Sequence, residues 1–163
     1  EVRDRLCLAD WVAPRSAGRA DYLAAFVTTA GEGVREQAEA WKEEGEYLKS
    51  YALQALAIET AEAYAELLHL ELRERWGIPD PPDLSRRDLF QARYRGIRVS
   101  FGYPACPDLE DQAKLWRLLE PDRRIGVQLT DGFMMDPEAS VSALVFHHPD
   151  ARYFSAGEPA VTA

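Results

Sequence analysis

Apolar and polar residues alternate along residues 96–101, and this alternation predicts a short strand. One face of the strand is apolar and consists of Ile97, Val99 and Phe101. The other face consists of Arg98, Ser100 and Gly102. This second face joins a fixed positive charge to small residues that let a ligand approach the backbone. Such a face suits a small molecule that bears a carboxylate, although an arginine on a strand is also commonly a surface residue paired with an acid.

Other segments have strand-like patterns as well. They lie at residues 6–12, 20–29, 126–130, 140–146 and 152–156. Residues 20–29 are largely apolar on both faces, which is typical of a strand covered on both sides. Gly31 and Gly33 follow this strand and are expected to end it.

The middle of the chain has a helical pattern. Residues 34–76 contain no proline and a single glycine, Gly45, so they form either two helices or one long interrupted helix. Gly77 and Pro79 are expected to end the second helical stretch. Helices are therefore grouped between strands that lie toward the two ends of the chain. This order predicts an α+β fold with a mostly antiparallel twisted sheet.

Two shorter helices are expected after a proline-rich connector over residues 78–88. Ser85 is a candidate N-cap for a helix over residues 86–92. Pro107 opens a further helix that ends near residue 119.

The second helical stretch, residues 52–76, is apolar in almost every direction around its axis, which is typical of a buried helix. Its charged residues form one narrow stripe, namely Glu59, Glu62, Glu66, His69 and Arg73. Two interpretations are open. The stripe is either the strip of surface that faces water, with Glu66 and Arg73 merely solvated, or the lining of a pocket. In the second case Glu62, near mid-helix, is best placed to receive a cationic group.

Composition and charge exclude several classes of protein. A length of 163 residues predicts one domain, residues 1–163, with a proper hydrophobic core. The net charge of -9 argues against a general nucleic-acid binder. No apolar run is long enough to span a bilayer, and no signal peptide precedes the first strand. We therefore expect a cytoplasmic protein without a membrane partner.

Cysteine and histidine content argues against a metal site. Cys7 and Cys106 are far apart and suit a reducing compartment, although they leave a disulfide open. His147 and His148 are adjacent, and adjacent positions on a strand face opposite sides, so the pair cannot easily chelate one ion. Neither a glycine-rich nucleotide-binding motif nor a serine nucleophile elbow occurs. The residues thus favour a small-molecule-binding domain that has no catalytic residue of its own.

Several segments together carry a resemblance to a known family. They are Asp21-Tyr22 with Phe26-Val27-Thr28, residues 61–69, Gly96-Ile97-Arg98 leading into Gly102-Tyr103-Pro104-Ala105-Cys106-Pro107, and residues 139–143 with His148-Pro149-Asp150 and Arg152-Tyr153-Phe154. Their order resembles the C-terminal activation domain of cobalamin-dependent methionine synthase over essentially the whole chain. The Gly-Tyr-Pro-Ala-Cys-Pro run is long and unusual, and it is the most specific part of the match.

The resemblance implies one part of an enzyme, a methyltransferase that converts homocysteine to methionine. It implies a domain that binds S-adenosylmethionine and presents the methyl group to a cobalamin carried by another module. In that family, inactive cob(II)alamin is restored to methylcobalamin with an electron from flavodoxin or a similar reductase. The implied partners are therefore the cobalamin-binding module and the reductase.

The family's contacts to S-adenosylmethionine can be carried over position by position. They fall on Asp21, Glu62, Arg98, Ser100, Gly102, Tyr103, Tyr153 and Phe154. Ser100 and Phe154 depart from the family pattern, which can have alanine and tyrosine there. In this assignment Arg98 binds the carboxylate of the ligand, and Glu62 or Asp21 balances its cationic groups. Tyr103 and Tyr153 form aromatic walls.

Other functions stay open at this point. One is a docking module that keeps the fold and has lost the ligand, and another is an independent methyltransferase that needs no cobalamin. An arginine cluster around the connector, Arg86, Arg87, Arg93, Arg95 and Arg98, has two interpretations as well. It either steers an acidic reductase or the cobalamin module, or it is a solvated turn.

Overall fold

The computed structural model describes residues 6–156 of the chain. These residues divide into two compact units. The first unit comprises the residues up to 25, residues 69–108 and the residues from 143 onward. The second unit comprises residues 26–68 and 109–142. Of the predicted site residues, Glu62 belongs to the second unit and all the others belong to the first.

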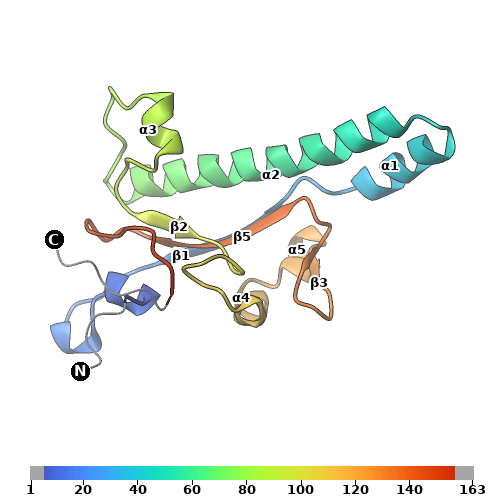
Figure 1. The fold of residues 1–163 in the computed structure, drawn as a ribbon. Helices are drawn as coiled ribbons and strands as arrows, with labels where there is room; N and C mark the ends of the chain where they lie inside the picture. Colours follow the sequence, from blue (N-terminus) through green and yellow to red (C-terminus); the bar gives the residue numbers. More distant parts are fainter. Residues whose placement is uncertain (1–5, 157–163) are drawn as a thin grey trace. The chain divides into compact units, whose positions relative to one another are not determined.

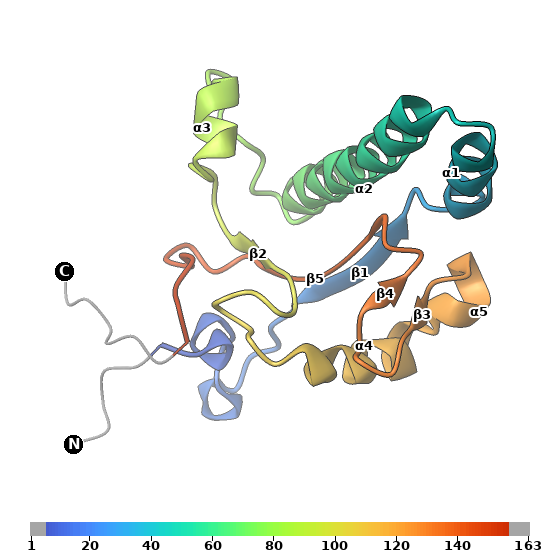
Figure 2. The same cartoon turned by 45° about the vertical axis from the view of Figure 1, so that its right-hand side comes forward.

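The main sheet has the strand order β1 (Ala24–Thr29), β5 (Ser140–Phe146) and β2 (Ile97–Val99), so that β5 is the central strand (Figures 1 and 2). β2 runs antiparallel to β5, with Arg98 opposite Val145 in the register. The α-helices occupy the middle of the chain, after β1 and before the last three strands, with β2 among them. The predicted α+β class with an antiparallel sheet is therefore confirmed.

The core of the first unit forms against the apolar face of β2. Ile97 and Val99 are buried there together with Trp11, Ala105 and Phe146. Burying one large apolar side chain contributes roughly 1.5–3 kcal/mol, so this cluster fixes which face of β2 points inward. The alternation predicted from the sequence is confirmed, because Arg98 lies between two buried residues and is itself only half-buried.

The prediction of a strand at residues 6–12 is wrong. These residues contain a 3-10 helix, η1 (Leu8–Trp11), and a second one follows, η2 (Arg15–Ala17). The carboxylate of Asp10 accepts a hydrogen bond of 2.8 Å from the backbone N–H of Cys7, which caps the start of η1. The local side-chain cap therefore outcompetes the extended conformation that the apolar pattern favours.

The predicted break in the central helical region is confirmed. α1 (Val34–Glu43) and α2 (Tyr47–Arg75) are joined by a short turn that contains Gly45 at φ +82° (Figure 1). Gly77, at φ +72°, follows the end of α2, and its N–H donates to the carbonyl oxygen of Glu74 at 3.0 Å. Both glycines adopt the left-handed conformation that other residues rarely tolerate.

The expectation that α2 is buried all round is wrong. Much of its large apolar surface is exposed, at Tyr47, Leu48, Tyr51, Leu56, Ile58, Tyr64 and Leu67. The buried face consists instead of small residues at four-residue spacing, Ala57, Ala61 and Ala65. In the second unit, Ala61 and Ala65 pack against Val141 of β5. Small contact residues let the helix backbone approach the strand closely. Among the described residues, no helix is long and apolar enough to cross a membrane.

The proline-rich connector and the short helix after it are confirmed. α3 (Arg86–Phe90) begins after Ser85, whose Oγ accepts a hydrogen bond of 3.2 Å from the N–H of Asp88. The carboxylate of Asp88 accepts in return from the N–H of Ser85 at 3.1 Å. The two residues form a capping box, which holds α3 in place although it has only five residues.

The second unit continues with a 3-10 turn, two helices and a hairpin. These are η3 (Leu109–Asp111), α4 (Gln112–Leu119), α5 (Pro121–Ile125), β3 (Gln128–Leu129) and β4 (Met135–Asp136). α5 was not expected, but Pro121 at its first position is well suited to open a helix. The side chain of Gln112 is buried, donates to the backbone oxygen of Phe133 at 2.8 Å and accepts from Ser142 Oγ at 2.6 Å. These bonds tie α4 to β5 within this unit.

Candidate functional site

Arg98 lies on the face of β2 that is turned away from the core of the first unit. Ser100 follows on the same side of the chain and is half-buried as well. The positive charge of Arg98 acts on the buried His69 and helps to lower the pKa of that histidine. Arg98 also interacts with other groups of the chain. A ligand carboxylate would therefore bind an arginine that already interacts within the chain.

The chain turns sharply just after β2. Gly102 has a φ of +80°, and its N–H donates to the carbonyl oxygen of Cys106 at 2.9 Å. The N–H of Cys106 donates to the carbonyl oxygen of Tyr103 at 2.8 Å. The side chain of Tyr103 remains more than half exposed. The Tyr-Pro turn expected from the sequence is confirmed, and it presents an aromatic ring only a few residues from Arg98.

The strand expected at residues 152–156 is wrong, because residues 152–155 have no regular secondary structure. The N–H of Ala156 donates to the carbonyl oxygen of Pro104 at 2.7 Å, in the turn after β2. Phe154 packs against the core of the first unit, with its ring centroid 6.5 Å from that of Trp11. Tyr153 is exposed beside it. The segment that carries both predicted aromatic contacts thus lies along the turn that carries Tyr103.

Asp21 is engaged by groups of the protein itself. Its carboxylate accepts hydrogen bonds from the N–H of Ala13 at 2.6 Å and of Tyr22 at 2.8 Å. Nε2 of His147 lies 3.0 Å from Oδ1 of Asp21. These contacts, the bond from Ala13 foremost, hold the pKa of Asp21 below its ordinary value of 3.8. The charged carboxylate therefore joins the loop before β1 to the residue after β5. A ligand cation would have to share it or displace His147.

Glu62 lies on α2 in the second unit, and its side chain is exposed. Glu59 and Glu66 are exposed too, whereas His69 and Arg73 are buried. The five residues therefore do not form one continuous strip of surface, and the interpretation of Arg73 as merely solvated is wrong. The buried line of small residues on α2 turns gradually around the helix at four-residue spacing and continues through His69 and Arg73. The role of Glu62 as a partner for a cation stays a prediction.

A buried cluster at the end of α2, made of His69, Arg73, Asp80 and Tyr94, was not expected; we call it the Arg73 cluster. Nε and Nη2 of Arg73 each donate a hydrogen bond of 2.6 Å to the carboxylate of Asp80. The guanidinium carbon lies 4.0 Å from the centre of the Tyr94 ring, and the His69 ring meets Tyr94 edge-on at 5.1 Å. Two-pronged pairing and ring stacking are the contacts for which arginine is best suited. The four-residue spacing with Ala61 and Ala65 is the signal that could have revealed it.

His69 is completely buried, and burial is the main reason that its pKa falls from 6.5 to about 3. The charges of Arg73 and Arg98 lower this pKa further, and that of Asp80 opposes them. Within the described part of the chain, neither ring nitrogen of His69 has a hydrogen-bond partner. The imidazole is therefore neutral at physiological pH. It adds no charge beside Arg98, where the arginines favour an anionic group.

The adjacent histidines face different partners. The ring centroid of His147 lies 5.0 Å from that of Trp76, and the ring centroid of His148 lies 5.7 Å from that of Trp11. Across residues 6–156, no group of three or more His, Cys, Asp or Glu side chains is placed to hold a metal ion. Both cysteines are thiols.

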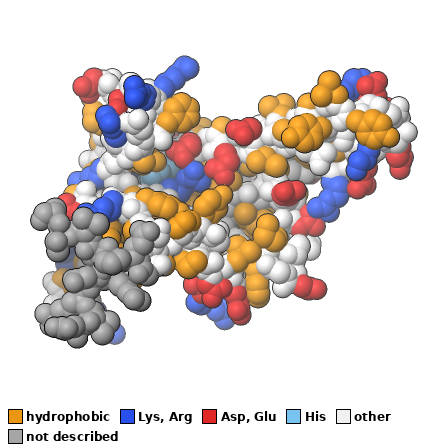
Figure 3. All heavy atoms as spheres, in the orientation of Figure 1, with side chains coloured by type: hydrophobic (Ala, Val, Ile, Leu, Met, Phe, Trp, Pro, Cys, Tyr) orange, Lys and Arg blue, Asp and Glu red, His pale blue; other side chains and the backbone are white. Residues whose placement is uncertain are grey.

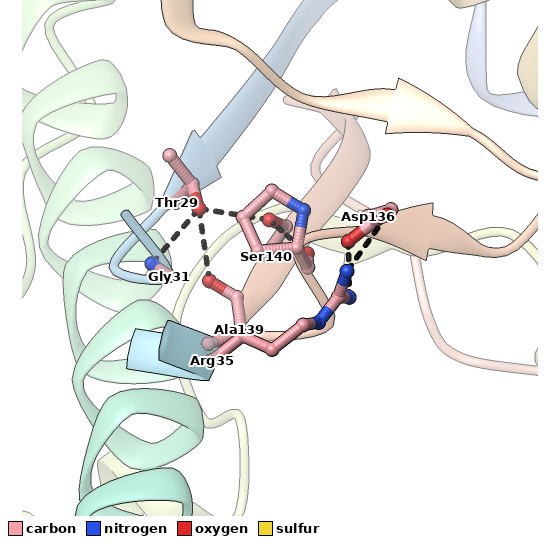
Figure 4. A network of polar contacts seen from close by, with 7 residues as sticks. Thr29, Gly31, Arg35, Asp136, Ala139 and Ser140 are labelled. Carbon is pink, nitrogen blue, oxygen red and sulfur yellow. Dashed lines mark hydrogen bonds and ion pairs between the residues drawn. The ribbon is translucent and has the colours of Figure 1, made fainter. Parts of the chain in front are cut away.

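A cavity of about 200 Å³ lies in the second unit, and none of the predicted site residues lines it. Figure 4 shows the polar network at its wall, where Arg35 forms an ion pair with Asp136. The hydroxyl of Ser140 lies 2.6 Å from the carbonyl oxygen of Pro137 and 2.9 Å from the hydroxyl of Thr29. The charged lining residues have both signs, Arg35 and Lys42 against Glu39 and Glu138. The charges of the lining residues therefore do not favour an anion over a cation in this cavity.

Substituting Gly31 with alanine is expected to strain this wall. A Cβ at Gly31 would lie 2.4 Å from Cβ of Pro137, so one of the two segments must move. We expect the free energy of unfolding, measured in urea, to fall by about 1–3 kcal/mol, the usual cost of overpacking. Gly132→Ala is the matched control, because its nearest atom would be 4.0 Å away, and its effect should stay within about 0.5 kcal/mol. Equal stability of both variants would show that Pro137 yields at no cost.

The comparisons with known proteins agree with the family resemblance found in the sequence. The family model described as "Vitamin B12 dependent methionine synthase, activation domain" matches residues 1–160. Among solved structures, the "Crystal Structure of the MetH Reactivation Domain bound to AdoHcy" is similar, with a TM-score of 0.86 and 42% sequence identity. The match covers 91% of this chain and 46% of that one, so this chain spans about half the length of the solved relative.

Proposed function

The chain belongs to the family of vitamin B12-dependent methionine synthase activation domains, and from this premise we propose that it binds S-adenosylmethionine and positions the methyl group for transfer to cobalamin. The cobalamin would be carried by another module, and the electron for the reaction would come from flavodoxin or a similar reductase. The solved relative supports the choice of ligand, since AdoHcy is what remains of S-adenosylmethionine after the methyl group has left.

The observation that carries the proposal is the hydrogen bond between Ala156 and Pro104. It holds the segment of Tyr153 against the turn of Tyr103, so both exposed tyrosines belong to one region of the first unit. Arg98 is on the strand that leads into this turn. A guanidinium near aromatic rings and exposed backbone is a suitable arrangement for a ligand with an amino-acid carboxylate and an adenine ring.

The residues present fit such a ligand. Arg98 would take the carboxylate, with the neutral His69 leaving the local charge positive. Gly102 and Ser100 leave the backbone accessible beside Tyr103, because their side chains are small or absent. Asp21, which is held charged by its depressed pKa, would balance a cationic group, and the role of Glu62 stays a prediction.

The chemistry asks little of these side chains. S-adenosylmethionine supplies the methyl group, and cobalamin accepts it after an electron has arrived. No general acid or base is needed, so the contribution of this chain is to bind and orient the methyl donor. We therefore assign no catalytic residue to it.

Calorimetric titration with S-adenosylmethionine tests the proposal. We expect Arg98→Ala to weaken binding about 10- to 100-fold, since a hydrogen bond to a charged group is worth about 1.5–3 kcal/mol. Arg93→Ala is the matched control, because this exposed arginine pairs with Asp88 outside the proposed site, and it should bind like the wild type. Circular dichroism would confirm that both variants are folded. Equal binding by Arg98→Ala would refute the assigned role of Arg98. A lack of any heat with the wild type would favour a docking module without ligand.

A further inference from the structure

We propose that α3 is a docking surface for an acidic face of a partner protein, with Phe90 as its apolar anchor and Arg86 and Arg87 as its charges. This inference rests on the proposed function, because a flavodoxin-like electron donor is an acidic protein. It adds the surface at which such a partner binds. It concerns a part of the chain that has no role in the proposed binding of S-adenosylmethionine.

The structure divides the arginine cluster into engaged and available members. Arg93 forms an ion pair with Asp88 at 3.1 Å, and Nε of Arg95 donates to the carbonyl oxygen of His147 at 3.1 Å. Arg86 and Arg87 are exposed, and within residues 6–156 their guanidinium groups have no ion-pair or hydrogen-bond partner. Two positive charges therefore remain uncompensated in a chain whose net charge is -9.

An apolar anchor lies beside these charges. Phe90 is 90% exposed, the highest value among the large hydrophobic residues that the structure describes, and Leu89 is 41% exposed. Figure 3 shows Lys and Arg side chains gathered over α3, with hydrophobic side chains beside them and some acidic ones. Aromatic residues and arginine are the types most enriched at the energetic centres of protein interfaces. The composition of this surface is therefore that of a contact surface.

The surface is also held in shape before any partner arrives. The capping box of Ser85 and Asp88 fixes the start of α3. The N–H of Arg93 donates to the carbonyl oxygen of Asp88 at 2.9 Å, which fixes the chain after the helix. Hydrogen bonds from Ser85 and the charge of Arg93 keep the pKa of Asp88 low, so the cap stays intact at neutral pH. A preformed surface loses less conformational entropy on binding than a loop would.

Charge determines which kind of partner fits. The net charge of -9 disfavours approach by an acidic protein, so attraction has to come from places where arginines lack counter-charges. A nucleic acid is a poor match, because two available arginines neutralise too few phosphates to overcome the net charge of -9. An acidic protein with an apolar recess for Phe90 satisfies both the charge and the aromatic ring.

Association and dissociation rates with a purified flavodoxin, measured by surface plasmon resonance, test the inference. Charge steering acts mainly on association, so R86E/R87E should lower the association rate at least tenfold at low salt. The reduction should be much smaller at 0.5 M salt, where the Debye length is only about 4 Å. Truncating a buried anchor acts mainly on dissociation. Phe90→Ala should therefore raise the dissociation rate at least tenfold at both salt concentrations.

Matched controls exist in the second unit. R123E/R124E reverses another adjacent pair of exposed arginines on a short helix, and Leu118→Ala truncates another exposed hydrophobic residue. Both should change the rates less than twofold. Flavodoxin binding that is unchanged in R86E/R87E and in Phe90→Ala would overturn the inference, because flavodoxin would then bind at a surface other than α3. No binding by the wild type would overturn it as well. S-adenosylmethionine titration of the same variants decides the ligand-binding function separately.

Discussion

Substituting Asp80 with asparagine is expected to lower the free energy of unfolding by about 3–5 kcal/mol, the range found when one partner of a buried ion pair is removed. Arg73 is only 2% exposed and holds both oxygens of Asp80 at 2.6 Å. Asparagine keeps the size of the side chain, but it leaves the buried guanidinium without a counter-charge. Urea unfolding at neutral pH measures the effect.

Two further variants separate charge from packing in this experiment. Asp83→Asn is the matched control, because Asp83 is exposed in the same connector and its substitution should cost less than about 0.5 kcal/mol. The double variant R73M/D80L removes both charges and should recover much of the loss, since a buried pair and an apolar pair of similar volume are often comparable in stability. A stability of Asp80→Asn equal to the wild type would mean that stacking on Tyr94 alone suffices for Arg73.

For α2, the sequence predicted the helix but not the residues that it buries. The helix and its C-terminal end were predictable, because glycine and the absence of proline act locally, although α2 begins at Tyr47 and not near residue 52. Its buried face was not, because the large apolar residues that dominate the pattern are exposed, whereas Ala61 and Ala65 meet the sheet. Helical periodicity identifies the residues that share a face, but close packing of small residues depends on the strand opposite.

Strand prediction succeeded or failed for a related reason. β5 occurs over the residues where a strand was expected, and nearly all of its residues are buried. Residues 6–12 and 152–156 were expected to be strands too, and side chains of both segments pack against the core of the first unit. Neither segment forms a strand in the structure. Alternation predicts a strand only where a neighbouring strand supplies hydrogen bonds, and the sequence does not show that neighbour.

The candidate site also has features that local sequence determines and features that depend on tertiary contacts. Arg98, Ser100 and Gly102 could be placed together from the sequence, because strand alternation and a turn act over a few residues. The approach of Tyr153 to this turn depends on a backbone bond between distant segments. The engagement of Asp21 by Ala13 and His147 is likewise tertiary, and the sequence gives no sign of it.

The dependence of stability on pH is expected to carry the signature of His69. In the unfolded chain this histidine takes up a proton near its ordinary pKa of 6.5, whereas in the folded chain it does so only near 3. Between these values the unfolded state binds more protons, so stability decreases as the pH falls through this window. The full loss is about 4–5 kcal/mol at about 1.4 kcal/mol per pKa unit, and roughly 2–3 kcal/mol of it is reached by about pH 4.5.

Comparing His69→Leu with the wild type isolates this contribution, because the other titrating groups are common to both proteins. Leucine is close to histidine in volume and leaves no buried ring nitrogen without a partner, as both nitrogens of His69 are. The difference in unfolding free energy between the two proteins should therefore shift in favour of His69→Leu as the pH falls from 6.5 to 4.5. His148→Leu, at a histidine that is only half-buried, should keep the steep decline. A constant difference between His69→Leu and the wild type across this range would mean that the folded chain protonates His69 without cost, so that neither burial nor the two arginines lower its pKa.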